Sequence, residues 1–212
     1  MDACVCPQPA SLTAILRATC KENLGQIQRF IFQRIHADNR FKVGDLGLIT
    51  ALASWTPLFA AADNTKVVSS PYVENFVIPR TEAATEGGGD NSTIDGIEIV
   101  VGANAATAIG QISETPSSVL IALRKLRCEV DLSVFMINQY GQIIGRDGTP
   151  GSTGTDVIGI PVQSFFVSDS DNNGLNTRDK ADIRFGLPYG WRDNLVITTP
   201  ADFNAKTQLW PA

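Results

Sequence analysis

Short runs of apolar and β-branched residues recur along the chain, separated by turns rich in glycine, asparagine and proline. Such runs, about four to eight residues long, are typical of β-strands. The pattern predicts a strand at 25–35, although Ile27, Ile31 and Ile35 also have helical spacing. Further strands are predicted at 67–79 with a break at Ser70-Pro71, at 97–101 as a buried strand, and at 157–168, 181–185 and 195–199. Residues 129–138 and 142–146 predict a hairpin that turns near Tyr140 and Gly141.

Helical periodicity is clearest at 118–127, after the sequence Thr115-Pro116-Ser117. Its apolar face contains Val119, Leu120, Leu123 and Leu126, and three basic residues in its last turn complement the helix dipole. A second helix is predicted from an Asp45 cap to about residue 54, before Pro57. A short helical segment around 12–18 is a further candidate.

These elements predict a mainly β (α+β) protein, an antiparallel β-sandwich or barrel with one flanking helix. We divide it into an N-terminal arm at 1–24 and a single β-rich domain at 25–212. Within that domain, residues 81–96 are polar and contain three consecutive glycines, so we expect a mobile loop there rather than a packed element.

The composition supports a folded protein that has partners. Hydrophobic residues make up 43% of the 212 residues, enough for a core, whereas charged residues make up only 18%. A typical soluble domain contains about 25% charged residues. A surface this poor in charge suits a protein that buries part of it against other subunits.

Charge is unevenly distributed along the chain. Between residues 81 and 123 there are six acidic residues and no lysine or arginine, while the remaining 16 acidic and 17 basic residues nearly balance. Residues 17–42 carry the opposite sign. We therefore predict a homo-oligomer interface in which the acidic loop of one subunit meets the basic segment of another, through Glu82, Glu86 and Asp90 on one side and Arg29, Arg34 and Arg40 on the other.

Two sets of residues resemble metal sites without completing them. Cys4, Cys6, Cys20 and His36 are of the types that bind zinc, but one residue between the first two cysteines is fewer than the usual spacing of two to four. We interpret the cysteines as reduced thiols, with Cys128 as a core residue at the end of its helix. Residues 169–174 match the start of an EF-hand calcium loop, but Lys180 occupies the position of the bidentate glutamate. A turn-rich hairpin loop is the preferred interpretation, and the sequence predicts no metal or other cofactor.

The sequence also predicts no enzymatic activity. Motifs for a nucleophile elbow, a zinc protease or a P-loop are missing, and the single histidine, His36, lies in a polar turn and is expected on the surface. Chemistry that uses two carboxylates remains open, because such pairs can be distant in sequence. The net charge of −5 argues against binding of nucleic acid through its phosphates. No segment approaches the roughly 18 apolar residues of a membrane helix, and the N-terminus lacks a secretion signal, so we expect synthesis in a cytoplasm without membrane association.

As a whole, the sequence resembles a structural protein of a tailed-bacteriophage virion, most closely a tail tube protein. The resemblance is carried by the basic segment that ends in 22–29 (ENLGQIQR), by the acidic loop, and by the helix at 118–127 that leads into the hairpin. The opening segment 4–34 also resembles the start of virion proteins from phages that infect gut Bacteroidetes.

This resemblance implies a non-enzymatic subunit of the virion, in six-fold rings that stack into a tube conducting DNA. Its partners would be copies of itself, other virion proteins and DNA in transit without specific binding. An acidic conduit would repel the phosphate backbone and let DNA slide. Another virion component, such as a neck, stopper or head decoration protein, and a carbohydrate-binding or calcium-dependent β-module are the alternatives.

Overall fold

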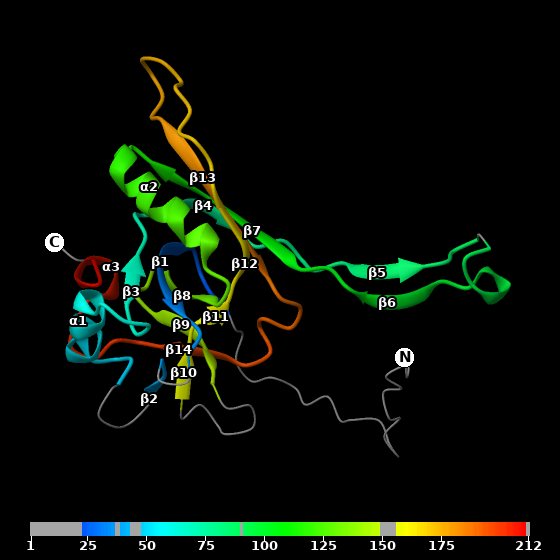
Figure 1. Ribbon diagram of the computed structural model, residues 1–212, viewed down its shortest axis with the longest axis horizontal. Helices are drawn as coiled ribbons and strands as arrows, with labels where there is room; N and C mark the ends of the chain where they lie inside the picture. Colours follow the sequence, from blue (N-terminus) through cyan, green and yellow to red (C-terminus); the bar gives the residue numbers. More distant parts are fainter. Residues whose placement is uncertain (1–22, 37–38, 43–47, 90, 149–155, 211–212) are drawn as a thin grey trace.

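The computed structural model describes residues 23–36, 39–42, 48–89, 91–148 and 156–210, and the expected N-terminal arm lies mostly outside them. The protein is mainly β, an antiparallel sandwich with a flanking helix, as the sequence predicted (Figure 1). Within the described ranges, the larger sheet has eight strands in the order β2-β10-β9-β8-β1-β3, with β11 paired to β8 and β14 to β9. They are β1 (Ile27–Arg34), β2 (Phe41–Lys42), β3 (Val67–Ser69), β8 (Leu132–Asn138), β9 (Ile143–Asp147), β10 (Asp156–Ile158), β11 (Ile160–Pro161) and β14 (Leu195–Thr198).

The smaller sheet has four described strands in the order β12-β13-β7-β4. They are β4 (Glu74–Val77), β7 (Ala106–Ser113), β12 (Gln163–Val167) and β13 (Lys180–Leu187). A separate ribbon is formed by β5 (Ala83–Glu86) and β6 (Ile99–Ala103). The helices are α1 (Leu52–Ala60), α2 (Ser117–Lys125) and α3 (Ala205–Gln208), with 3-10 turns η1 (Ile94–Gly96) and η2 (Leu126–Cys128).

The larger sheet is buried on both faces, because successive side chains of a strand point to opposite sides. On β1, Phe30 and Phe32 face the smaller sheet, and the Phe30 ring centroid lies 5.3 Å from that of Phe185 on β13. Ile31 faces the other side, where α1 and α3 contribute Trp55 and Ala205 to a second apolar cluster. This double cover explains why every residue of β8 is buried.

Helix α2 confirms the predicted apolar face. Leu120 and Leu123 are buried in the core between the sheets, and Val119 and Leu126 pack against it. Cys128, at the end of η2, is exposed rather than in the core, so that prediction was wrong. The short 3-10 turn places Leu126, not Cys128, against the core.

Helix α1 differs from its predicted bounds. It begins at Leu52, and Pro57 lies inside it. The N-cap residue Ala51 makes no side-chain capping bond, but the backbone amide of Leu52 donates to the carboxylate of Asp202 at 3.2 Å. The Trp55 indole donates to the Ile49 carbonyl at 2.9 Å. A cap from a residue so distant in sequence, together with burial of Trp55, sets the position of the helix. The predicted cap, Asp45, lies outside the described residues.

Most of the strand predictions are confirmed. The predicted strand at 25–35 is β1, the broken strand at 67–79 is β3 and β4, and the hairpin is β8 and β9. The strands predicted in the C-terminal part are β10 to β14. Two expectations about the acidic segment were wrong. Residues 83–86 form a strand within the expected loop, and β6 is exposed along its whole length rather than buried. The backbone pairing of β5 with β6 explains the first difference, and the position of β6 away from the core explains the second.

Candidate functional site

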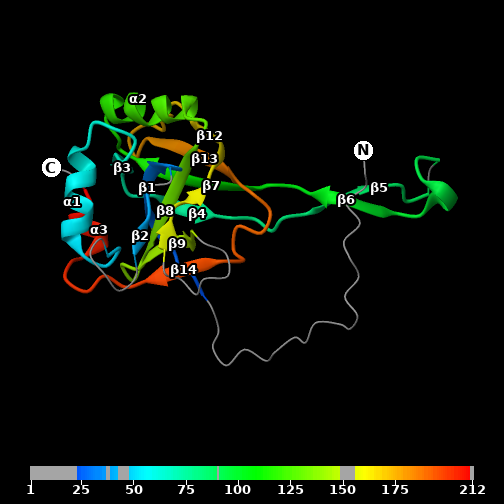
Figure 2. The same cartoon turned by 60° about the horizontal axis from the view of Figure 1, so that its bottom comes forward.

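A two-stranded arm, residues 82–104, projects from the sandwich (Figure 1), and Figure 2 shows the same separation after rotation. Its strands pair from Ala83 with Ala103 to Glu86 with Ile99. The arm continues the ribbon of β4 and β7, and the backbone amide of Asn104 donates to the Glu82 carbonyl at 2.9 Å at its base. The sequence thus extends two strands of the smaller sheet well beyond the core.

The arm exposes a concentration of aliphatic side chains. Ile97, Ile99, Val100 and Val101 are each 50–67% exposed, and Ile94 at the tip is 88% exposed. A two-stranded ribbon has no second layer to cover such side chains, and an isolated hairpin is only marginally stable in water. Apolar groups gathered on an exposed element are characteristic of a surface that binds a partner.

The tip of the arm is held by backbone geometry that glycine permits. Gly87, Gly88 and Gly89 have φ values of 93°, 95° and 105°. A side chain at these angles would be strained. Across the turn, the Thr93 hydroxyl donates to the Ile97 carbonyl at 2.6 Å. The three glycines therefore adopt backbone angles that favour glycine, and the Gly89 amide donates to the Gly96 carbonyl at 3.1 Å.

The arm is acidic as well as aliphatic. The side chains of Glu82, Glu86, Asp95 and Glu98 are exposed, and the sequence has no basic residue from 81 to 123. Asp90, the third acidic residue of the predicted interface, lies outside the described residues. The arm therefore offers apolar contact area bordered by negative charge.

A second exposed surface, with three apolar side chains and one arginine, lies on the outer face of the smaller sheet. Strand pairing aligns Phe166 of β12 with Arg184 of β13, Arg184 with Ile109 of β7, and Ile109 with Val77 of β4. Phe166, Ile109 and Val77 are all exposed. Residues opposite one another in adjacent strands lie close together on one face, so these four form a continuous row. The sequence analysis missed this row because it did not identify β7 as a strand.

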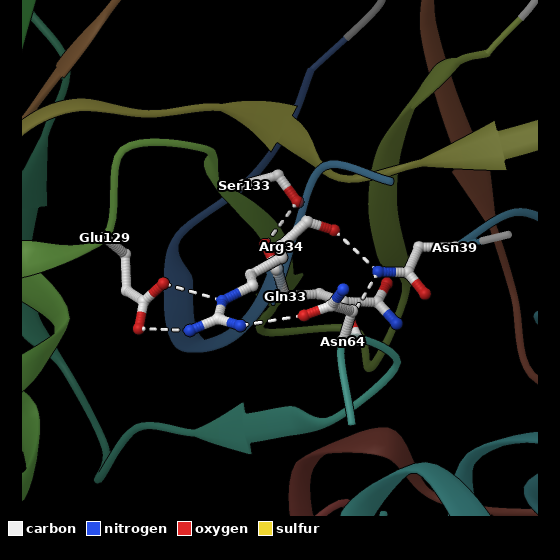
Figure 3. A network of polar contacts seen from close by, with 6 residues as sticks. All are labelled: Gln33, Arg34, Asn39, Asn64, Glu129 and Ser133. Atoms are coloured by element: carbon white, nitrogen blue, oxygen red, sulfur yellow. Dashed lines mark hydrogen bonds and ion pairs between the residues drawn. The ribbon is translucent and has the colours of Figure 1, made fainter. Parts of the chain in front are cut away.

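Arg34 lies at the end of β1 in a polar network (Figure 3). Its Nε and Nη2 donate to the two carboxylate oxygens of Glu129 at 2.6 and 2.8 Å, and its Nη1 donates to the Asn64 side-chain oxygen at 2.8 Å. The Asn39 amide donates to the carbonyls of Arg34 and Asn64, each at 2.8 Å. The hydrogen bonds from Arg34 hold the pKa of Glu129 below its usual value. The network borders a surface hollow of about 500 Å³ and joins β1 to the segments before β3 and after α2.

The other two predicted interface arginines have different surroundings. Arg40 lies 3.6 Å from the Asp156 carboxylate and is exposed. Arg29 is buried, with only 4% of its surface exposed, and this burial lowers its pKa. Both lie in the sandwich, whereas Glu82 and Glu86 lie on the arm. The structure places the two halves of the predicted interface on separate parts of one subunit, and contact between them in an oligomer stays a prediction.

The segment resembling a calcium loop connects β12 to β13, as the hairpin interpretation expected. Its carboxylates bind groups of the protein. Asp169 pairs with Arg124 of α2 at 2.7 Å, and Asp171 accepts the backbone amide of Lys180 at 2.6 Å and the side-chain amide of Asn173, also at 2.6 Å. These hydrogen bonds lower the pKa of Asp171. The carboxylates of Asp169 and Asp171 thus already have partners within the protein, a side-chain cation for the first and two amides for the second.

Of the four residues of zinc-binding type, which we interpreted as reduced thiols and a surface histidine, Cys4, Cys6 and Cys20 lie outside the described residues and His36 is exposed. In the described part of the chain, no group of three or more histidine, cysteine, aspartate or glutamate side chains could hold a metal ion.

No protein-family model matches the chain, and a search of curated proteins found no match either. None of the helices in the described ranges is long and apolar enough to cross a membrane.

Proposed function

We propose that this protein is a non-enzymatic structural subunit of a tailed-phage virion, and that it assembles with copies of itself as stacked rings of a tail tube that conducts DNA. The observation that carries the proposal is the projecting arm with its exposed aliphatic residues. Burial of apolar surface contributes about 25 cal/mol per Å². A partner that covers the arm would therefore gain stability that the isolated subunit cannot.

The arm and the outer face of the smaller sheet are different surfaces on one chain. If the arm of one copy docks on another surface of the next copy, the contact is heterologous, and such contacts produce rings or open-ended filaments. A tube of stacked rings needs both kinds of contact, one that closes each ring and one that stacks the rings without end. The geometry thus suits serial assembly better than a closed dimer through one self-complementary patch.

The acidic arm also suits passage of DNA. A surface that lines a conduit without basic residues does not retain the phosphate backbone. Neck, stopper and head decoration proteins share the need to self-associate, so they remain the alternatives within the virion. A carbohydrate-binding or calcium-dependent module is the alternative outside the virion, and it gives no reason for the exposed aliphatic residues of the arm.

The test is replacement of the arm. Residues 83–103 are replaced by Asn-Gly, a favoured two-residue hairpin turn, which joins Glu82 to Asn104. We expect the parent to form rings or tubes at high concentration, seen by negative-stain microscopy and light scattering. The armless variant should stay monomeric with an unchanged melting temperature.

The matched control shortens a different projecting turn, with residues 174–177 replaced by one glycine. This variant should assemble as the parent does. A parent that remains a featureless monomer, or an armless variant that still forms long assemblies, would contradict the proposal.

A further inference from the structure

Arg29 is a buried cation whose hydrogen-bonding groups are incompletely used. Its Nε and Nη1 are shielded from water and have no hydrogen-bond partner in the part of the chain that the structure describes. Two buried guanidinium nitrogens without an acceptor are costly, because their N–H groups lose the water that they bind in the unfolded chain. Something must offset that cost, or an acceptor must arrive from outside.

Two aromatic rings offset part of the cost. The Arg29 Cζ lies 4.1 Å from the ring centroid of Tyr72 and 4.9 Å from that of Trp210. The Tyr72 hydroxyl donates to the Lys206 carbonyl at 3.1 Å, which fixes the orientation of its ring. Aromatic faces attract the cation, but they do not replace the in-plane oxygen acceptors that a guanidinium prefers.

Arg29, Tyr72 and Trp210 lie together in the lining of a surface hollow of about 660 Å³. Other walls include Arg178 and the carboxylates of Glu74 and Glu114. Arg178 lies 3.5 Å from Glu74, so that pair is already balanced. The second carboxylate, Glu114, disfavours a doubly charged anion such as phosphate. A planar, singly charged group with two oxygens is the acceptor that suits this hollow.

We propose that the hollow beside Arg29 is a binding site for a carboxylate group, which accepts hydrogen bonds from the guanidinium while Trp210 shifts to admit it. The carboxylate has two possible sources. One is a small free carboxylic acid, and the other is an acidic side chain from the arm of a second copy, Glu82 or Glu86. The hollow belongs to a single subunit, so binding of a free acid does not depend on the proposed function, whereas the second source rests on its self-association.

The first experiment titrates the parent with sodium acetate against sodium chloride at constant ionic strength. Trp55 and Trp191 are buried, whereas Trp210 is partly exposed beside the hollow, so its fluorescence should report occupancy. We expect a saturable change in fluorescence and a rise in melting temperature with acetate alone. The Trp210→Phe variant should lose the fluorescence change and keep the rise in melting temperature.

Arg29→Met separates a binding role from a structural one. If the cation serves binding, the variant should lose the acetate response and melt at the same or a higher temperature, because an apolar side chain of similar length suits a buried position. Arg29→Lys keeps the charge without the planar fork and should weaken acetate binding at least tenfold. The control is Arg192→Met, which removes an exposed arginine 5.8 Å from the Trp191 ring and should leave acetate binding intact.

The second experiment identifies the source. If acetate dissociates assemblies that chloride leaves intact, and Glu82→Gln or Glu86→Gln weakens them, the carboxylate comes from a second copy. If acetate binds without affecting assembly, the ligand is a free acid. A parent without a saturable acetate response, or an Arg29→Met variant that responds like the parent, would overturn the site even if the chain assembles as proposed.

Discussion

The β4–β7 pair and the β5–β6 pair are two stretches of one antiparallel ribbon, and they differ in what covers them. In the sandwich, alternate residues of β7 are buried against the core. In the arm, no residue of β6 is buried. The ribbon crosses from one environment to the other within the two residues that separate Ala103 from Ala106.

The side chains of these two strands reverse the usual relation between residue type and burial. The core positions of β7 are Ala106, Ala108, Gly110 and Ile112, mostly small residues. The exposed strand β6 has the sequence IVVGA, which begins with three aliphatic residues of high β-propensity. At Gly110 of β7, the absence of a side chain leaves room for Val73 and Phe76, whose atoms would lie 2.6 and 3.0 Å from a Cβ there. The large aliphatic residues of β6 stay exposed in the part of the chain that the structure describes, which is why we propose that another copy covers them.

The difference between the sandwich and the arm is tested most directly by making the same isoleucine-to-alanine substitution in each. Ile183→Ala removes a fully buried side chain of β13 and should lower the free energy of unfolding by about 2–5 kcal/mol. Ile99→Ala in the arm should change it by no more than about 0.5 kcal/mol, because an exposed side chain loses little packing. Urea denaturation of each variant, at a concentration where the chain is monomeric, measures both values.

Equal losses from the two isoleucines would mean that the arm folds against the body and that its aliphatic side chains already have a partner within the subunit. In the assembled state the Ile99 side chain should matter more than it does for the stability of the monomer. Ile99→Ala should then weaken association, which sedimentation of the parent and variant at matched concentrations would reveal.

Much of the sandwich could be predicted from the sequence, because strands such as β1 and β8 carry long apolar runs that few other structures accommodate. β7 was missed for a physical reason. Three of its four buried positions are alanine or glycine, whose local preference for strands is weak, and its eight-residue pairing with β13 stabilises it instead. The start of α1 was missed because its cap, Asp202, lies 150 residues away.

The second prediction uses two glycines of the same ribbon. A Cβ at Gly110 of β7 would lie 2.6 Å from a methyl group of Val73, so Gly110→Ala overpacks the core and should cost about 1–3 kcal/mol. A Cβ at Gly102 of β6 would meet nothing within 4 Å. Gly102→Ala should be neutral or slightly stabilising, because alanine restricts the unfolded chain more than glycine does. Thermal melts of the two variants give the comparison, and a large loss at Gly102 would show that the arm is covered.

The candidate sites were only partly predictable. The acidic and basic segments were evident from charge alone, but the sequence does not reveal which arginine is buried. Arg29 acquires its surroundings from Tyr72, 43 positions later, and from Trp210 in the C-terminal segment, and only the folded chain brings the three together. Arg34, five residues after Arg29, instead meets Glu129 at the surface. Residues of one type on one strand thus have different roles because different elements lie opposite them.

The third and smallest effect concerns the Arg34–Glu129 ion pair, which joins the end of β1 to the segment after α2. Because the folded-state pKa of Glu129 is lowered, the pair contributes stability above the unfolded-state pKa, about 4.5, and loses it as the pH falls through the folded-state value. Glu129→Gln should therefore have a lower free energy of unfolding than the parent at pH 6–7, by about 0–1 kcal/mol as for other exposed ion pairs. The two free energies should converge as the solution becomes more acidic. Arg34→Met should show the same convergence, since it removes the other partner. Urea denaturation across this pH range measures the difference, and a gap between parent and Glu129→Gln that persists at low pH would mean that packing, rather than the ion pair, joins this end of β1 to the segment after α2.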